Sequence, residues 1–130
     1  MLEPGIHGER TVIVTEALTA RSMGSGELMV FATPAMAALM EETAWRSVAG
    51  ELPAGSGTVG TALELYHLAP TPLGAEVRCI SKLVRTEGRT LEFELEVYDP
   101  AGLVGRGRHE RVIVDNARFS RKAESRIPSE

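Results

Sequence analysis

The segment "VFATPAMAALMEETAW", residues 30–45, combines an apolar helical pattern with two adjacent carboxylates, Glu41 and Glu42. Neighbours on a helix lie three and four residues apart. The helical neighbours of Glu41 are all apolar and mostly small: Ala37, Ala38, Ala44 and Trp45. Glu42 instead has Arg46 four residues later, the favourable order for an ion pair. We therefore predict that Glu42 is a solvated or paired charge at the helix edge. Glu41 is predicted to be buried, either serving as a nucleophile or general base, or satisfied by a backbone N–H or a partner chain.

Three further residues offer a hydroxyl, an imidazole and an unobstructed backbone. Thr33 suits a helix N-cap, but it also lies at the positive end of the helix dipole, where an oxyanion is stabilised. In residues 58–67, strict alternation puts His67 on the more apolar face and Gly60 on the other. His67 is then either a core histidine or a catalytic one. Gly60 marks either a bulge in a curved sheet or the close approach of a ligand. Together these groups are components for acyl chemistry.

The elements that must position these groups are one strand, one long helix and four more strands. A β-branched strand is predicted over 9–18, followed by a Gly- and Ser-rich mobile loop. The helix is expected to start at Thr33 and Pro34 and to stop at Gly50 in a left-handed C-cap. The later strands are predicted over residues 58–67, 75–88, 89–98 and 103–114, and their short connections favour an antiparallel meander.

This order of elements predicts an α+β domain and resembles the hot-dog fold, an antiparallel sheet wrapped around one long central helix. We treat residues 1–130 as a single domain, with a core over about 9–115 and a polar tail over 116–130 that is expected to fray. An edge strand of such a sheet must be covered. Pairing with a second copy covers it, so we expect a homodimer.

Composition narrows the classes of function. The chain has 130 residues, of which 43% are hydrophobic and 25% charged, and its net charge of −4 argues against a nucleic-acid partner. No apolar run has the length of about 20 residues that a membrane span needs, and the first ten residues do not suggest a secretory signal. The single cysteine, Cys79, is interpreted as a small buried side chain and favours a cytoplasmic location. The dispersed histidines predict neither a metal site nor a cofactor.

Three segments carry a resemblance to a known family: "VFATPAMAALMEETAW", "GSGTVGTALELYHLAPTPLG" and "GRGRHERVIV". In this order and at these separations they resemble the fluoroacetyl-CoA thioesterase family of hot-dog proteins, over residues 30 to about 119. The resemblance implies a homodimeric acyl-CoA thioesterase with catalytic residues at Thr33, Glu41 and His67. It implies that the backbone amide of Gly60 holds the thioester carbonyl. We add Phe31, in the same "VFAT" segment, as a substrate-binding residue.

Two further segments bear on this resemblance. The "HER" of residues 109–111 matches the family pattern, and we interpret it as a solvated strand face or a dimer contact. Before residue 30 the family's specialised enzyme carries a longer lid with phenylalanines that shape the acyl pocket. Here that region is "TARSMGSGELM", which is shorter, rich in glycine and without phenylalanine. Loss of selectivity for a fluorinated acyl group is therefore expected, with the hydrolytic chemistry retained.

The expected reaction is hydrolysis of a small acyl-CoA thioester to the free acid and CoA. Two other functions remain open at this point. One is a hot-dog hydratase or dehydratase acting on acyl thioesters, since a carboxylate and an imidazole also serve that reaction. The other is a non-catalytic protein that binds an acyl thioester or another small ligand.

Overall fold

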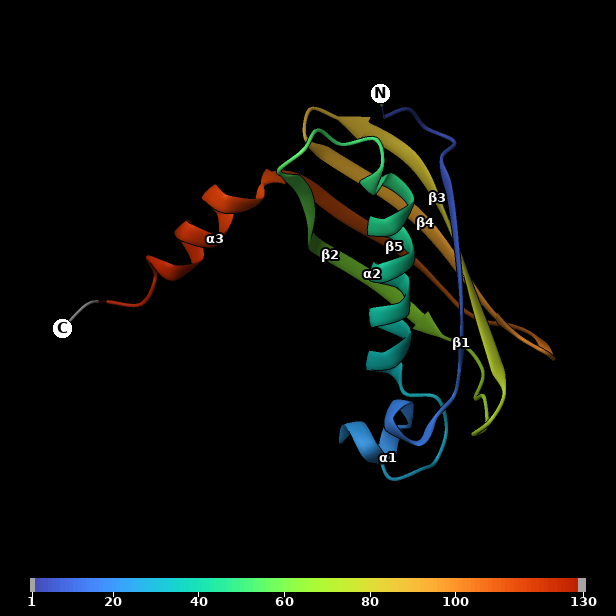
Figure 1. Cartoon of the computed structure of the whole chain (residues 1–130). Helices are drawn as coiled ribbons and strands as arrows, with labels where there is room; N and C mark the ends of the chain where they lie inside the picture. Colours follow the sequence, from blue (N-terminus) through green and yellow to red (C-terminus); the bar gives the residue numbers. More distant parts are fainter. Residues whose placement is uncertain (1, 129–130) are drawn as a thin grey trace.

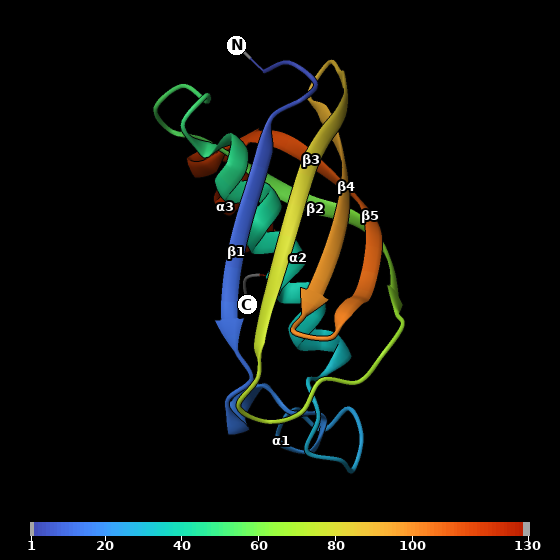
Figure 2. The same ribbon diagram turned by 90° about the vertical axis from the view of Figure 1, so that its right-hand side faces the viewer.

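The computed structural model describes residues 2–128. Five antiparallel strands form one sheet in the order β1-β3-β4-β5-β2, and the sheet curves around the long helix α2 (Figures 1 and 2). The strands are β1 (His7–Ile13), β2 (Ser56–His67), β3 (Glu76–Glu87), β4 (Thr90–Asp99) and β5 (Gly102–Asp115). The helical elements are η1 (Glu16–Leu18), α1 (Ala20–Met23), α2 (Thr33–Ala49) and α3 (Asn116–Glu124). The expected α+β architecture, with an antiparallel sheet around one long helix, is confirmed.

The core lies between α2 and the inner face of the sheet. Alternate residues of β3 and β4 are buried against the helix, which contributes Met36, Leu39, Met40 and Val48 among others. Two glycines let α2 lie close to β5. A Cβ on Gly105 would collide with the Met36 sulfur, and one on Gly107 would lie 3.2 Å from the Met40 sulfur. The inner face of β5 therefore runs through residues 105 and 107 and on toward its C-terminal end.

A β-bulge in β2 decides which residues face the helix. Gly60 pairs with Arg111 and Ala62 pairs with Glu110, so Thr61 is the extra residue. Because one inserted residue reverses the alternation, Gly60 lies on the same face of the sheet as His67. The expectation that these two residues occupy opposite faces, which assumed strict alternation, is wrong. The bulge itself is one of the two explanations that the sequence left open for Gly60.

The two ends of α2 also differ from expectation. The N-cap is Ala32 and not Thr33, which is the first helical residue and makes no capping hydrogen bond. The Thr33 hydroxyl is therefore free to bind another partner. Gly50 has φ of −70°, so the helix ends in a right-handed conformation and not in the left-handed C-cap that was predicted.

The segments on either side of the core contain more helix than the sequence indicated. The first strand ends at Ile13, because the chain turns into η1 where a continuous strand over 9–18 was predicted. The predicted loop after it contains the helical turn α1, for which Thr19 Oγ1 accepts a hydrogen bond from the Ser22 amide. The polar tail forms α3, because Asp115 Oδ1 accepts a hydrogen bond from the Arg118 amide and caps the helix. Among residues 2–128, no helix is long and apolar enough to cross a membrane.

Candidate active site

The first group of the site joins the start of α2 to the end of β2. Thr33 Oγ1 and His67 Nδ1 lie 2.8 Å apart and form a hydrogen bond. Burial lowers the pKa of His67, and a backbone hydrogen bond at Ala69 partly offsets this effect. The imidazole is therefore favoured in its neutral form, which can accept a proton.

Phe31 packs against the histidine of this group. Its ring is buried and meets the His67 ring edge-on, with centroids 6.5 Å apart. Thr33, His67 and Phe31 line a cavity of about 260 Å³, whose other walls include Ala20 and Ser25. The side chains that the α1 region brings to this cavity are small. The cavity leaves room beside the Thr33–His67 pair for part of a small ligand.

The second group lies two helical turns further along α2, at Glu41. A Cβ built on Gly60 would lie 3.4 Å from Glu41 Oε1. It would also lie 3.1 Å from His109 Cε1 and 3.3 Å from Arg111 Nη1. Only a glycine leaves this space open, so the carboxylate, the guanidinium and the imidazole all surround the bare backbone of Gly60.

The exposure of the two glutamates differs from the sequence prediction. The Glu41 side chain is 47% exposed and that of Glu42 is 35% exposed, so the prediction that Glu41 is buried is wrong for the single chain. Glu41 lies on the face of α2 that also carries the exposed Ala38 and Trp45, and nothing in residues 2–128 covers this face. Glu42 pairs with Arg46 at 2.8 Å, as predicted. It also lies 3.4 Å from the Arg10 guanidinium on β1.

Arg111 holds the second group together. Its Nε donates to Thr58 Oγ1 at 2.8 Å and its Nη2 to the Thr58 carbonyl at 2.9 Å. Its Nη1 lies 3.8 Å from Glu41 Oε1 and 3.0 Å from His109 Nε2. The guanidinium is thus fixed on three sides and presents a positive charge to the Glu41 carboxylate.

The tautomer of His109 follows from its partners. His109 Nδ1 lies 2.8 Å from the Ala62 carbonyl, which only accepts, so Nδ1 carries the proton. Nε2 is then the acceptor for the Arg111 guanidinium. Burial lowers the pKa of His109, and the positive charge of Arg111 lowers it further. Burial also lowers the pKa of Arg111, while the Glu41 carboxylate acts in the opposite direction.

The interpretation of residues 109–111 as a solvated strand face is wrong for two of the three. His109 and Arg111 are buried at 3% and 6% exposure, and only Glu110 points outward, where it accepts a hydrogen bond from Thr61. The sequence does contain a signal for this. The two glycines at 105 and 107 lie on the helix-facing side of β5, and the same alternation continues to 109 and 111.

Within one chain the four expected residues form two separate groups. Thr33 and Glu41 are eight residues apart, which is about 12 Å along a helix axis. The structure brings Thr33 together with His67, and Glu41 together with Gly60, but it does not bring the two pairs into contact. Among the described residues, no cluster of three or more His, Cys, Asp or Glu side chains could hold a metal ion.

Cys79 does not contribute to either group. Its side chain is fully buried on the inner face of β3, and burial raises the pKa of its thiol to about 11. A thiol with so high a pKa is a poor nucleophile, in agreement with its interpretation as a small buried side chain.

Comparisons with known proteins agree on one family. The model of the fluoroacetyl-CoA-specific thioesterase family matches residues 14–117. A fluoroacetyl-CoA thioesterase from Streptantibioticus cattleyicolor is 36% identical over 100 residues, which is 77% of this chain and 72% of that protein.

Solved structures show the same relationship. The crystal structure of the fluoroacetyl-CoA thioesterase FlK superposes with a TM-score of 0.92 at 31% identity, covering 98% of this chain and 99% of that one. A thioesterase superfamily member from Thermus thermophilus superposes with a TM-score of 0.88 at 29% identity, covering 97% and 96% of the two chains. The sheet wrapped around α2 is the hot-dog fold, and the chain belongs to the fluoroacetyl-CoA-specific thioesterase family.

Proposed function

We propose that the protein is an acyl-CoA thioesterase that hydrolyses a small acyl-CoA to the free acid and CoA. One observation carries this proposal: the Glu41 carboxylate faces the bare backbone of Gly60, with the Arg111 guanidinium beside it. A carboxylate next to an unobstructed strand backbone provides both a reactive group and a place for a thioester carbonyl. Membership of a thioesterase family supports the same reaction.

The residues have the following roles in this reaction. The Gly60 N–H donates to the thioester carbonyl oxygen and stabilises the oxyanion that forms there. Glu41 either attacks the carbonyl carbon itself, forming a mixed anhydride that water then hydrolyses, or removes a proton from the attacking water. The C–S bond breaks, and the CoA thiolate leaves and takes up a proton. Thr33 and His67, held to each other by their hydrogen bond, position the water and assist the leaving thiolate.

A panel of short acyl-CoAs with a thiol reagent tests the reaction. Thiol release that depends on Glu41 supports hydrolysis. Loss of the absorbance of an enoyl-CoA without thiol release would show a hydratase, and binding without turnover would show a binding protein. After a single turnover in ¹⁸O-water, label in the Glu41 carboxylate would show that this carboxylate attacks and forms an anhydride, because general-base catalysis puts the label only in the acid product.

We propose further that the active protein is a homodimer and that each site contains residues of both copies. The exposed face of α2 and the free edge of β2 adjoin each other, and no part of the described chain covers them. If two α2 helices pack antiparallel about a two-fold axis at Ala37, Thr33 of one copy lies opposite the partner's Glu41, because Ala37 is midway between them. The small side chains of Ala37 and Ala38 allow the helices to approach closely. This pairing would join the two groups that one chain keeps apart.

Mixed dimers test the composite site. A Glu41→Gln subunit and a Thr33→Ala subunit are co-expressed with different tags, and the heterodimer is purified. A composite site leaves one intact site per heterodimer and restores about half of the wild-type activity. If each site belongs to one chain, both sites carry a defect, and the activity stays at or below half that of the Thr33→Ala dimer. A stable, fully active monomer in sedimentation would overturn the dimer.

We place this activity in the cytoplasm, on the basis of the single, buried cysteine. Fractionation of cells that express the tagged protein checks the location, and recovery in a secreted or membrane fraction would contradict it.

A further inference from the structure

The C-terminal helix concentrates positive charge in an acidic protein. The chain has a net charge of −4, yet residues 116–126 contain four basic residues and one acidic residue. Helix α3 projects from the corner of the sheet where β5 ends and touches little besides that strand (Figure 1). The basic side chains of α3 do not take part in packing the core, because no α3 side chain is buried.

A hollow of about 500 Å³ lies between α3 and this corner of the sheet. Its walls include three cationic side chains, Arg89, Arg118 and Lys122, together with the half-exposed ring of Phe119. The one acidic side chain in the walls, Asp115, caps α3 with its carboxylate. The hollow therefore combines three cations with an aromatic face.

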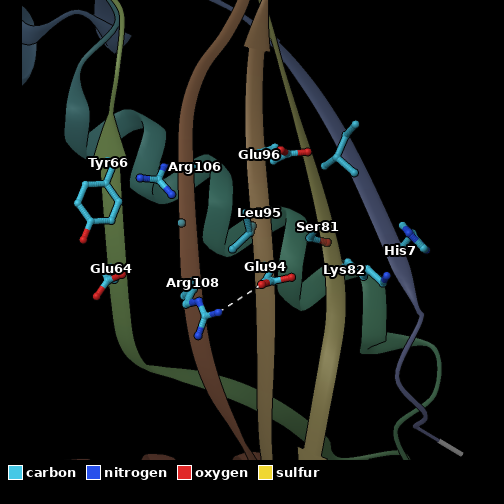
Figure 3. A pocket seen from close by; sticks show the side chains of 12 residues that line it. His7, Glu64, Tyr66, Ser81, Lys82, Glu94, Leu95, Glu96, Arg106 and Arg108 are labelled. Carbon is cyan, nitrogen blue, oxygen red and sulfur yellow. Dashed lines mark hydrogen bonds and ion pairs between the residues drawn. The ribbon is translucent and has the colours of Figure 1, made fainter.

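Two arginines on the outer face of the sheet, by contrast, have partners. Figure 3 shows Arg108 extending toward Glu94, 3.5 Å away, and Arg106 packs on the Tyr66 ring at 5.0 Å. Within residues 2–128, no ion pair involves the side chains of Arg89, Arg118 or Lys122. Like charges gathered without partners repel one another, and an anion in the hollow removes this cost.

We propose that this hollow binds the phosphorylated nucleotide end of CoA, an inference that rests on the proposed thioesterase function. Arginine forks and a lysine are suited to the 3′-phosphate and the diphosphate, and Phe119 offers a face on which the adenine stacks. The position also fits. Ser56, in the wall of the hollow, lies four residues from Gly60 on β2, which corresponds to about 13 Å of strand. An extended pantetheine arm covers that distance from the thioester to the nucleotide.

Paired substrates test this assignment. Kinetics are measured with acetyl-CoA and with S-acetyl-N-acetylcysteamine, which has the same thioester but no nucleotide. The double variant Arg118→Ala/Lys122→Ala should raise KM for acetyl-CoA at least ten-fold, with kcat and the kinetics of the short substrate unchanged. Arg121→Ala is the matched control, since Arg121 is on the same helix but does not line the hollow. It should leave KM for acetyl-CoA within about two-fold.

Direct binding separates this inference from the reaction itself. Adenosine 3′,5′-bisphosphate should bind to the wild-type protein in calorimetry, more weakly at high salt, and at least ten-fold more weakly to the double variant. Equal losses on both thioester substrates, or unchanged bisphosphate binding, would overturn the nucleotide site. Absence of turnover with bisphosphate binding intact would refute the thioesterase and leave the nucleotide site standing. Binding to vesicles of equal parts phosphatidylcholine and phosphatidylserine, without bisphosphate binding, would show a membrane surface and overturn the proposal.

Discussion

Helix α2 carries one polar group at its N-terminal end and another in its middle, and the two are built differently. In the middle, Arg111 is fixed by Thr58 and His109 and faces Glu41, and the bulge in β2 leaves the Gly60 backbone open between them. At the N-terminal end, Thr33 and His67 share one hydrogen bond beside a cavity to which the α1 region brings only small side chains. A network with several partners resists movement, whereas a single bond beside a cavity tolerates different ligands. In the proposed reaction the middle group therefore holds the reacting carboxylate firmly, and the cavity beside the Thr33–His67 pair leaves room for different acyl groups.

The largest effect is expected at Glu41. Glu41→Gln keeps the shape of the side chain but removes the charge that attacks or takes a proton, so kcat should fall at least about a hundred-fold. Glu42→Gln is the matched control. It removes only the surface pairs with Arg46 and Arg10, and should leave kcat within a few-fold. Equal losses in the two variants, with circular dichroism unchanged, would contradict the assignment.

Gly60→Ala should have the next largest effect. The new methyl group would lie 3.1–3.4 Å from atoms of Glu41, His109 and Arg111, so these side chains must move apart. We expect kcat/KM to fall about ten- to a hundred-fold. Gly50→Ala is the control, because nothing lies within 4 Å of its Cβ and its φ is negative. Full activity in Gly60→Ala would show that the open backbone is not used.

Thr33→Ala distinguishes a catalytic hydroxyl from a helix cap. Loss of an N-cap side chain costs about 1 kcal/mol of stability. Because Thr33 follows the N-cap and its hydroxyl bonds His67, the variant should unfold at nearly the wild-type urea midpoint. Its kcat should nevertheless fall about ten-fold. A lower midpoint with unchanged kcat would reverse this interpretation.

His109 should make stability depend on pH. Burial and Arg111 lower the pKa of His109 in the folded protein, whereas in the unfolded chain it is about 6.5. Below about pH 6.5 the unfolded chain therefore binds more protons than the folded one, and the free energy of unfolding should fall as the pH is lowered. Urea unfolding at a series of pH values measures this slope. His109→Gln should make this slope shallower, and an unchanged slope would contradict the prediction.

The fold was predictable from the sequence to a greater extent than the detail of the site. Alternation in residues such as Leu91 and Phe93, and the long apolar helix, report burial directly, so the sheet and helix agree with expectation. A bulge was one of the two explanations that the sequence offered for Gly60, but the pairing of β2 with β5 decides it, and the bulge reverses the face of Gly60. The exposure of Glu41 depends on which other segments pack against α2, and the sequence of the helix alone does not show this.

The smallest effect is expected in the choice between fluoroacetyl-CoA and acetyl-CoA, which should be hydrolysed with kcat/KM values within about ten-fold of each other. The two acyl groups are nearly the same size, so packing alone discriminates between them by only about 1–3 kcal/mol. The segment next to the Thr33–His67 cavity contributes Ala20 and Ser25, and it has no aromatic side chain between residues 19 and 30 to close the cavity against water. Somewhat longer acyl-CoAs should also be accepted. Side-by-side kinetics under one set of conditions decide the matter. A preference for fluoroacetyl-CoA of about a thousand-fold or more, equivalent to about 4 kcal/mol, would show that selectivity does not depend on aromatic side chains in the segment before residue 30.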